Sequence, residues 1–165
     1  PEFESPTGHQ SLHSVFVSFI NLNETLHCRG HQRAWRNWTA KDIDFDVELD
    51  KIQYSGYESL LSHVWSNLID NAIKFDPQGG MIALRLRQSG DCAVFTIDDN
   101  GPGVPPQEQE RIFHKFYQVD NSREVSGNGL GLALVRQIVS FSGGTVAVEN
   151  LPEAGCRFTV TLPLA

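Results

Sequence analysis

Hydrophobic residues recur along the chain at intervals that predict three helices. Between positions 11 and 26 they fall every three or four residues, which places them on one side of a helix. The same spacing predicts a second helix over 55–75, stopped by the segment 76–80, and a third over 130–142, stopped by Gly143 and Gly144. We expect the buried side of the second helix to consist of Leu60, Leu61, Val64, Leu68, Ile69, Ala72 and Ile73.

Shorter segments carry the pattern of β-strands. Apolar and acidic residues alternate over 43–49, which predicts a strand with one side in solvent. The segments 81–88 and 92–98 are joined by a short turn and predict a hairpin, and 145–149 and 156–162 predict two closing strands. This order of elements predicts an α/β (α+β) two-layer sandwich, in which a mixed five-stranded sheet carries three main helices on one face.

One long stretch, 101–126, predicts no firm regular element. Loops of this length inside a compact domain are usually functional. Within it, Phe113, Phe116 and Tyr117 are spaced by three and four residues, which predicts a helical turn packed on the core.

Composition narrows the class of protein. The 165 residues carry a net charge of −7 and 40% hydrophobic side chains, which fits a single globular domain and argues against nucleic-acid binding. No apolar run is long enough to cross a bilayer. The three cysteines form no CxxC pair, so neither a disulfide framework nor a zinc site is indicated, and a reducing cytoplasm fits best. We expect 1–8 to be a cloning remnant or linker and 9–165 to be the domain.

The second predicted helix carries a polar stripe. His63, Asn67, Asn71 and Lys74 are separated by four, four and three residues, so they share one side of the helix. An ordinary solvated face would show the same spacing. Asparagine, however, is a poor helix residue, so two on one face need a reason. An amide oxygen is a suitable ligand for Mg²⁺, and a lysine offers a compact charge to phosphate.

Two glycine-rich segments follow. In the first, 98–103, Asp99 is a carboxylate acceptor suited to an exocyclic amine, although an ordinary Asn-Gly turn is the alternative. In the second, 127–132, three alternate glycines open the third helix, so backbone N–H groups and the helix N-terminus form an anion site; a flexible loop is the alternative. The spacing matches neither the Walker loop nor the dinucleotide fingerprint.

The order of these motifs is more specific than any one of them. Asn-x-x-x-Asn-Ala-x-Lys, Asp-x-Gly-x-Gly, a Phe-rich segment and Gly-x-Gly-x-Gly-Leu resemble the catalytic ATP-binding domain of sensor histidine kinases. That family shares a superfamily with gyrase-type topoisomerases, heat-shock chaperones and mismatch-repair ATPases. The resemblance covers roughly 11–164. It implies a Bergerat-type ATP-binding fold that binds Mg²⁺ and ATP and transfers the γ-phosphoryl group to a histidine on a separate dimerisation domain.

The resemblance also implies roles by position. Asn71 corresponds to the Mg²⁺ ligand, Asn67 to its partner one turn earlier, and Lys74 to a phosphate contact. Asp99 would accept from the adenine amine, and the segment 104–126 would be a lid over ATP. The catalytic set implied is Asn67, Lys74 and Arg123. The other nucleotide-binding residues implied are Phe75, Gly101, Gly103, Phe116, Gly127, Asn128, Gly129, Leu130, Gly131 and Leu132.

Two positions separate this chain from relatives. Hydrolysing members of the superfamily carry a glutamate where this chain has Asn67, and an amide cannot act as a base near neutral pH. We therefore expect slow hydrolysis, with the phosphoryl group kept for another acceptor. Many kinases carry an arginine at the position of Gln118, which cannot offer a charged fork to phosphate. Arg123, further along the lid, is the expected substitute.

No histidine of the chain stands in the sequence context of a phosphoacceptor. We therefore expect the acceptor to lie outside this chain, which would bind Mg-ATP as a monomer without autophosphorylating. The resemblance implies a homodimeric full-length protein, a response-regulator partner, and a cytoplasmic domain of an inner-membrane sensor. Two alternatives stay open: a non-catalytic nucleotide-binding module, suggested by Gln118, and an anti-sigma-type serine kinase or ATPase of the same superfamily. The histidines considered are His9, His13, His27, His31, His63 and His114.

Overall fold

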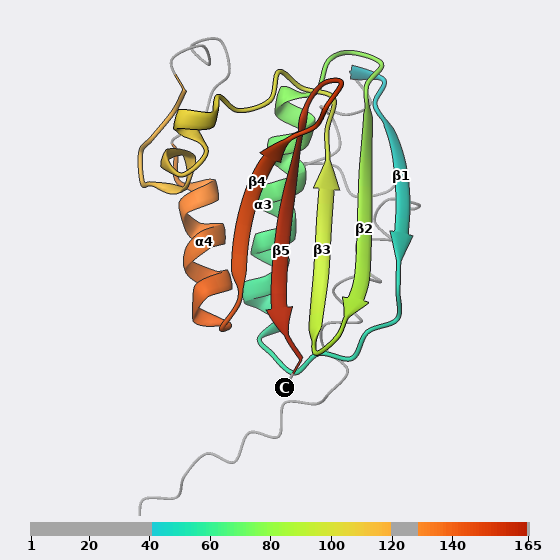
Figure 1. The fold of residues 1–165 in the computed structure, drawn as a ribbon, viewed down its shortest axis with the longest axis vertical. Coiled ribbons are helices and arrows are strands. Elements are labelled where there is room, and N and C mark those ends of the chain that lie inside the picture. Colours follow the sequence, from blue (N-terminus) through green and yellow to red (C-terminus); the bar gives the residue numbers. More distant parts are fainter. Residues whose placement is uncertain (1–40, 120–128, 165) are drawn as a thin grey trace, which may run out of the picture.

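Five strands form one mixed sheet in the computed structural model, which describes residues 41–119 and 129–164. The strands lie in the order β1-β2-β3-β5-β4 (Figure 1). β1 runs parallel to β2, and every other neighbouring pair is antiparallel. The strands are β1 (Asp44–Leu49), β2 (Met81–Ser89), β3 (Cys92–Asp98), β4 (Thr145–Asn150) and β5 (Cys156–Pro163).

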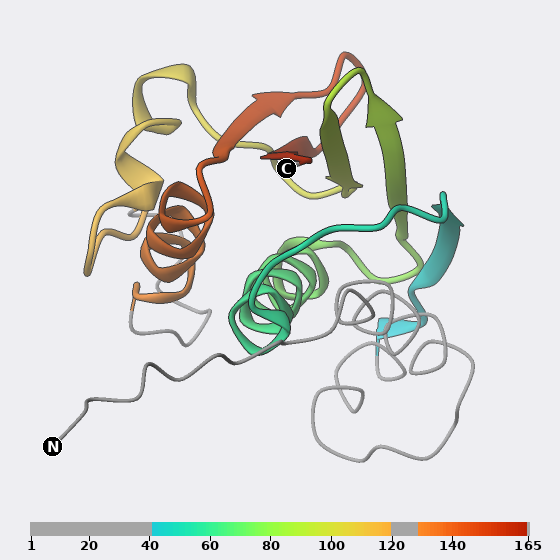
Figure 2. The same ribbon diagram turned by 90° about the horizontal axis from the view of Figure 1, so that it is seen from below.

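Two long helices cover one face of this sheet. Figure 2 shows α3 (Glu58–Phe75) and α4 (Gly131–Phe141) on the same side of the strands. α3 packs against β3, and α4 packs against both α3 and β4. The predicted two-layer sandwich with a mixed five-stranded sheet is therefore confirmed. The first predicted helix, over 11–26, lies outside the described residues.

The apolar side of α3 forms the centre of the core. The predicted buried side is confirmed at every position except Leu60, which is half-buried. Trp65 is buried as well, and its ring centroid lies 4.6 Å from that of Phe95 on β3. Burying a large apolar side chain contributes roughly 1.5–3 kcal/mol. This row of contacts fixes α3, and so fixes the polar stripe on its other side.

α3 begins at Glu58, three residues later than predicted. Gly56 lies against Tyr54: a Cβ at Gly56 would be 2.3 Å from Cε1 of the tyrosine ring. Tyr54 is buried, and Tyr57 has an extended backbone at the N-cap position. The chain is therefore held on the core in a non-helical conformation here, which the spacing of apolar residues does not reveal.

The long segment after β3 contains two short 3₁₀ helices, η1 (Pro106–Glu108) and η2 (Arg111–Phe113). Phe113 is buried and its ring stands edge-on to Phe158 of β5, at a centroid distance of 6.2 Å. Tyr117 is half-buried, whereas Phe116 is 74% exposed. The predicted core role is thus wrong for Phe116. Its backbone has a φ of +63° and its N–H donates to the carbonyl of Gly129, which turns the side chain outward.

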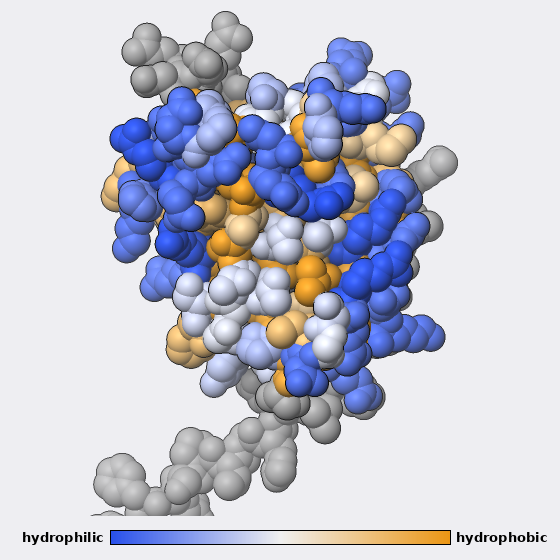
Figure 3. Space-filling model, in the orientation of Figure 1, coloured by the Kyte–Doolittle hydropathy of each residue, from blue (hydrophilic) through white to orange (hydrophobic). Residues whose placement is uncertain are grey.

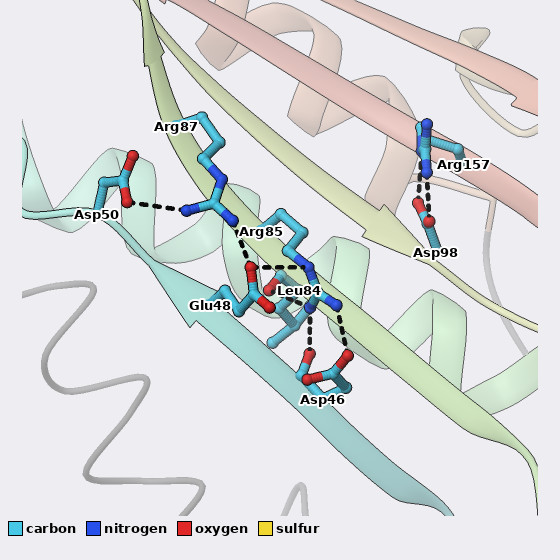
Figure 4. A network of polar contacts seen from close by, with 8 residues as sticks. All are labelled: Asp46, Glu48, Asp50, Leu84, Arg85, Arg87, Asp98 and Arg157. Atoms are coloured by element: carbon cyan, nitrogen blue, oxygen red, sulfur yellow. Dashed lines mark hydrogen bonds and ion pairs between the residues drawn. The ribbon is translucent and has the colours of Figure 1, made fainter.

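The face of the sheet opposite the helices is held at its β1 edge by ion pairs. Arg85 and Arg87 of β2 pair with the carboxylates of Asp46 and Glu48 on β1 and of Asp50 just after it (Figure 4). Exposed ion pairs contribute only about 0–1 kcal/mol each. Charged side chains on an edge strand also oppose pairing with other chains. We therefore assign these ion pairs mainly to protecting the β1 edge from pairing with other chains.

The rest of that face is less polar. Figure 3 shows pale and orange side chains along its middle, bordered by the charged side chains over β1 and β2. Val94, Thr96, Thr159 and Thr161 lie there, half-buried, on β3 and β5.

Among the described residues, no helix combines the length and apolar character needed to cross a membrane.

Candidate functional site

A cleft of about 610 Å³ opens beside α3. It is bounded by the second half of that helix, the segment after β3, and the start of α4. Its volume falls in the range of pockets that hold small ligands, roughly 300–1,000 Å³. The side chains of α3 that line it are Asn67, Asp70, Asn71, Lys74 and Phe75.

Most of the predicted polar stripe faces this cleft. Asn67, Asn71 and Lys74 line it, whereas His63 is exposed and is not part of its wall. The carbonyl oxygen of His63 accepts a hydrogen bond of 2.7 Å from Nδ2 of Asn67. The remaining amide oxygen, Oδ1 of Asn67, lies beside Gly131 at the beginning of α4.

Lys74 contributes an ammonium group to the cleft wall. Its Nζ lies 5.1 Å from the centroid of the Phe75 ring, and no acidic partner pairs with it among the described residues. Burial lowers its pKa, because desolvation disfavours the ammonium form. An anionic ligand in the cleft would supply the missing charge.

Asp70 is a cleft residue that the sequence reasoning missed. It stands three residues after Asn67 and four before Lys74, so it shares their side of the helix. Burial raises its pKa, since the carboxylate loses hydration there. The same spacing argument that singled out the asparagines would have found it.

Asp99 is the buried carboxylate of the site. It is 4% exposed, and its Oδ1 accepts from the N–H groups of Gly101 (2.9 Å) and Cys156 (3.2 Å). Its Oδ2 accepts from Sγ of Cys156 at 3.2 Å. Burial, reinforced by the charge of Asp99, raises the pKa of the Cys156 thiol, which therefore stays protonated as a donor. A carboxylate has about four acceptor positions, so Asp99 retains capacity for a ligand that donates a hydrogen bond.

Close backbone contacts hold the segment around Asp99. A Cβ at Gly155 would lie 1.8 Å from the carbonyl oxygen of Asp99, so only glycine fits. The side chain of Asn150 accepts from the N–H of Val104 and donates to its carbonyl oxygen, each at 2.8 Å. Gly103 has a φ of +74° and lies next to the same asparagine. The β4–β5 hairpin thereby fixes the cleft wall after β3.

The start of α4 forms the opposite wall. Gly129, Gly131 and Leu132 line the cleft, and Gly129 has a φ of +66°. The partial positive charge of a helix N-terminus favours an anion at such a place. Gln118 also lines the cleft.

Six other predicted site residues are not found in the cleft wall. Gly101, Phe116 and Leu130 do not line the cleft. Arg123, Gly127 and Asn128 lie outside the described residues.

Apolar side chains complete the cleft. They come from five separate stretches of the chain, so no local pattern in the sequence marks them as a group. Those lining it are Val104, Pro105, Ile112, Val119, Leu132 and Phe158.

Another group that the sequence did not indicate lies where α3 ends. Asp76 is 2% exposed, lines the cleft, and accepts a hydrogen bond of 2.6 Å from the N–H of Asn100. Burial raises its pKa, and the nearby charge of Asp99 acts in the same direction. Lys41, just before β1, also lines the cleft. These residues connect the end of α3 with the segment that follows β3.

A family model fits most of the described chain. The family described as histidine kinase-, DNA gyrase B- and HSP90-like ATPases matches residues 56–165. Among curated relatives, the signal transduction histidine-protein kinase/phosphatase MprB of Mycobacterium ulcerans is 42% identical over 115 residues, which cover 69% of this chain and 22% of the relative. The alginate biosynthesis sensor protein KinB of Pseudomonas aeruginosa is 32% identical over 158 residues, which cover 96% of this chain and 26% of the relative.

Solved structures show the same architecture. The mycobacterial sensor histidine kinase MprB superposes with a TM-score of 0.73 at 33% identity, covering 91% of this chain and 93% of that chain. Full-length ShkA in complex with AMPPNP superposes with a TM-score of 0.74 at 26% identity, covering 92% of this chain and 30% of that chain. This chain spans only about a quarter of the length of the curated relatives MprB and KinB, at 22% and 26%.

Proposed function

Because this chain belongs to the family of histidine kinase-, DNA gyrase B- and HSP90-like ATPases, we propose that its cleft binds Mg-ATP and presents the γ-phosphoryl group to a histidine on a separate domain. One observation carries the proposal. A buried carboxylate, Asp99, lines the same cleft as the start of α4 and as Lys74, whose ammonium pairs with no acidic side chain of the described residues. An adenine nucleotide complements all three, since it offers an amine donor and a chain of phosphates.

The base would lie against Asp99. Its carboxylate is held in place by the N–H groups of Gly101 and Cys156 and by the thiol of Cys156. It can therefore accept a further hydrogen bond without having to move. The exocyclic amine of adenine is a donor that such a carboxylate can bind. The apolar side chains of the cleft, Ile112 and Phe158 among them, would cover the faces of the ring.

The phosphates would lie between α3 and the start of α4. Lys74 supplies a full positive charge, and the backbone N–H groups at Gly129 and Gly131 supply partial ones. Full-length ShkA was solved in complex with AMPPNP, which supports a nucleotide as the ligand. Phosphoryl transfer depends mostly on positioning and on neutralising charge, which these groups provide.

The residues present also fit a magnesium ion. Mg²⁺ prefers oxygen ligands and keeps waters and substrate phosphates around it. Asn71 lines the cleft and has an amide oxygen, which is a hard ligand, and Asp70 lines the same cleft with a carboxylate. When bound, the ion would neutralise phosphate charge. We therefore assign Asn71 as the direct ligand, with Asn67 one turn earlier on the same wall.

The described wall of the cleft contains no glutamate near Asn67. An amide does not remove a proton from water, so this position does not promote hydrolysis. Transfer would instead form a bond between a histidine nitrogen of the acceptor and the γ-phosphorus, while the bond to the β–γ bridging oxygen breaks and ADP leaves with its electron pair. Arg123 is proposed to contribute charge to this step. We further propose that a response regulator accepts the phosphoryl group from the histidine. We also propose that residues 9–165 form the ATP-binding domain and belong to a cytoplasmic region of a sensor protein.

Mg-ATP binding is the first test. Calorimetry and thermal unfolding should show saturable binding, and ligand at 100 times its Kd should add about 2.7 kcal/mol and raise the midpoint by roughly 5–10 °C. Mg-GTP is the matched control, because its base offers a carbonyl where adenine has the amine. No shift with any adenine nucleotide would remove the proposal.

Phosphotransfer needs a separate test, because Gln118 in the cleft favours a second candidate: a module that binds the nucleotide without transferring phosphate. The acceptor domain of the full-length protein should be supplied in trans with ATP labelled on the γ-phosphate. Acid-labile, base-stable label on that domain supports the kinase. Binding without transfer, together with transfer after Gln118→Arg, would support the module. Label stable to acid would indicate a serine kinase instead.

A further inference from the structure

Lys41 places its ammonium group at the C-terminal end of α3. Its Nζ donates to the backbone carbonyl oxygens of Ile73 (2.9 Å), Lys74 (2.7 Å) and Asp76 (2.9 Å). The last carbonyls of a helix have no partner within the helix. An ammonium has three donors, so all of its hydrogen-bonding capacity is directed to this one helix end.

The backbone of Lys41 is fixed to the same region. Its carbonyl oxygen accepts from the N–H of Gly79 at 2.8 Å, and three residues later the N–H of Asp44 donates to Gly80 at 3.0 Å. The residue therefore lies beside the turn between α3 and β2, although it is more than thirty positions from the helix end in sequence. Its placement depends on the strand pairing of β1 with β2.

This helix end carries the groups proposed to meet the nucleotide. Lys74 and Phe75 are the last cleft residues of α3, and the carbonyl of Lys74 is itself one of the three acceptors. The last turn of a helix frays when its carbonyls lack partners. Three charge-assisted bonds oppose that fraying and so limit where the Lys74 side chain can go.

Electrostatics acts in the same direction. A helix C-terminus carries a partial negative charge, which would repel a phosphate close to Lys74. The Lys41 ammonium lies against the carbonyls that carry this charge and lines the cleft as well. It therefore both orders the turn and offsets the unfavourable end of the helix dipole.

We propose that Lys41 is a positioning residue for the nucleotide: it holds the last turn of α3 so that Lys74 meets the phosphates. This inference rests on the proposed Mg-ATP binding. All three donors of the Lys41 ammonium bind backbone carbonyl oxygens of the protein. Its effect on the ligand is therefore transmitted through Lys74.

The test compares ATP with adenosine. In Lys41→Met, which keeps the apolar stem, we expect calorimetry to show ATP affinity reduced about tenfold, because charge-assisted hydrogen bonds are lost. Adenosine affinity should stay unchanged. Lys41→Arg should recover most of the ATP affinity, since a guanidinium also donates to carbonyls. Lys51→Met, at an exposed lysine beyond β1, is the matched control. If Lys41→Met does not fold, Lys41→Gln, which keeps a neutral donor, carries the same comparison.

A double substitution separates the possible roles. If Lys41 acts through Lys74, adding Lys41→Met to Lys74→Met should cost no further ATP affinity. Additive losses would mean that Lys41 contacts the nucleotide itself, and equal losses for ATP and adenosine would mean general structural support; either result overturns the inference. If the wild-type protein binds ATP and Lys41→Met binds it with the same affinity, the inference is overturned as well. Wild-type protein that binds no ATP overturns the proposed function, and the inference with it.

Discussion

Asn67 and Gly131 lie against each other across the cleft, one on α3 and one at the first residue of α4. A Cβ at Gly131 would be only 2.7 Å from Oδ1 of Asn67. The other end of the amide is bound to the carbonyl of His63. The helix start proposed to face the phosphates and the asparagine of the predicted polar stripe are therefore in direct steric contact.

Gly131→Ala should separate affinity from stability. The added methyl would displace the Asn67 side chain. We expect ATP affinity to fall about tenfold in calorimetry, because one polar contact of Asn67 with the ligand is lost. Alanine is favoured over glycine in a helix, so the free energy of unfolding should stay within about 1 kcal/mol of wild type.

A glycine elsewhere provides the control for that result. Gly90, in the β2–β3 turn, has a φ of +56° and open space around it. Gly90→Ala should therefore lower stability by about 1 kcal/mol through backbone strain, with ATP affinity unchanged. If Gly131→Ala bound ATP like wild type, the contact with Asn67 would have no bearing on the ligand.

Asp99→Asn should remove the preference for adenine. The amide can keep accepting from the N–H groups of Gly101 and Cys156, but its nitrogen cannot accept from a ligand amine. We expect ATP affinity to fall about 100-fold, the cost of losing a hydrogen bond to a buried charge. Wild type should prefer ATP over inosine triphosphate, which lacks the amine, and the variant should not.

Asp98→Asn is the matched control, because the neighbouring carboxylate points to the other face of the sheet. There it holds Arg157 through bonds of 2.7 and 2.6 Å (Figure 4). The same chemical change at Asp98 should leave the preference for ATP intact. A preference that survives in Asp99→Asn would contradict the assignment of the base.

Much of this architecture could be predicted from the sequence because it depends on local periodicity. The apolar spacing on α3 predicted which side is buried, and the hairpin of β2 and β3 followed from two apolar segments with a short turn. The polar stripe was visible for the same reason. Patterns of this kind depend on neighbours a few residues apart.

What could not be predicted depends on contacts between distant segments. The thiol of Cys156 reaches Asp99 across 57 positions, and the ammonium of Lys41 reaches the end of α3 across 32 to 35. The spacing predicts Phe116 in a helical turn packed on the core, yet a backbone bond to Gly129 turns it outward. None of these contacts produces a periodic signal, because each becomes possible only once the sheet has formed.

Cys156 should resist alkylation. The thiolate is the reactive form, and burial together with Asp99 raises the pKa of this thiol. In the native protein at pH 8, mass spectrometry after iodoacetamide should show Cys156 labelled more than about tenfold slower than the half-buried Cys92. Denatured protein, in which both thiols are exposed, is the control and should label them at similar rates.

The same thiol should affect alkaline stability. In the unfolded chain a cysteine thiol has a pKa of about 8.5, whereas in the folded state the pKa of Cys156 is raised. Stability from this group is therefore fully present below that pH and is lost as the pH rises through the raised folded pKa. Cys156→Ser keeps a donor for Asp99 but does not titrate, so its midpoint should fall less than that of wild type between pH 8 and pH 10. Parallel curves would contradict this role.

Asp76→Asn should reveal the cost of a buried carboxylate. Burial raises the pKa of Asp76, so the folded state binds its proton more strongly than the unfolded state does. Stability from this group is therefore fully present below the unfolded pKa of about 3.9 and is lost as the pH rises through the raised folded pKa. Asparagine has no charge to desolvate and can still accept from Asn100. We expect the midpoint of the variant, relative to wild type, to rise by a few degrees between pH 3.5 and pH 7 in thermal unfolding. Asp91→Asn, at an exposed turn, measures the effect of removing a charge alone, and an equal rise there would contradict the role of burial.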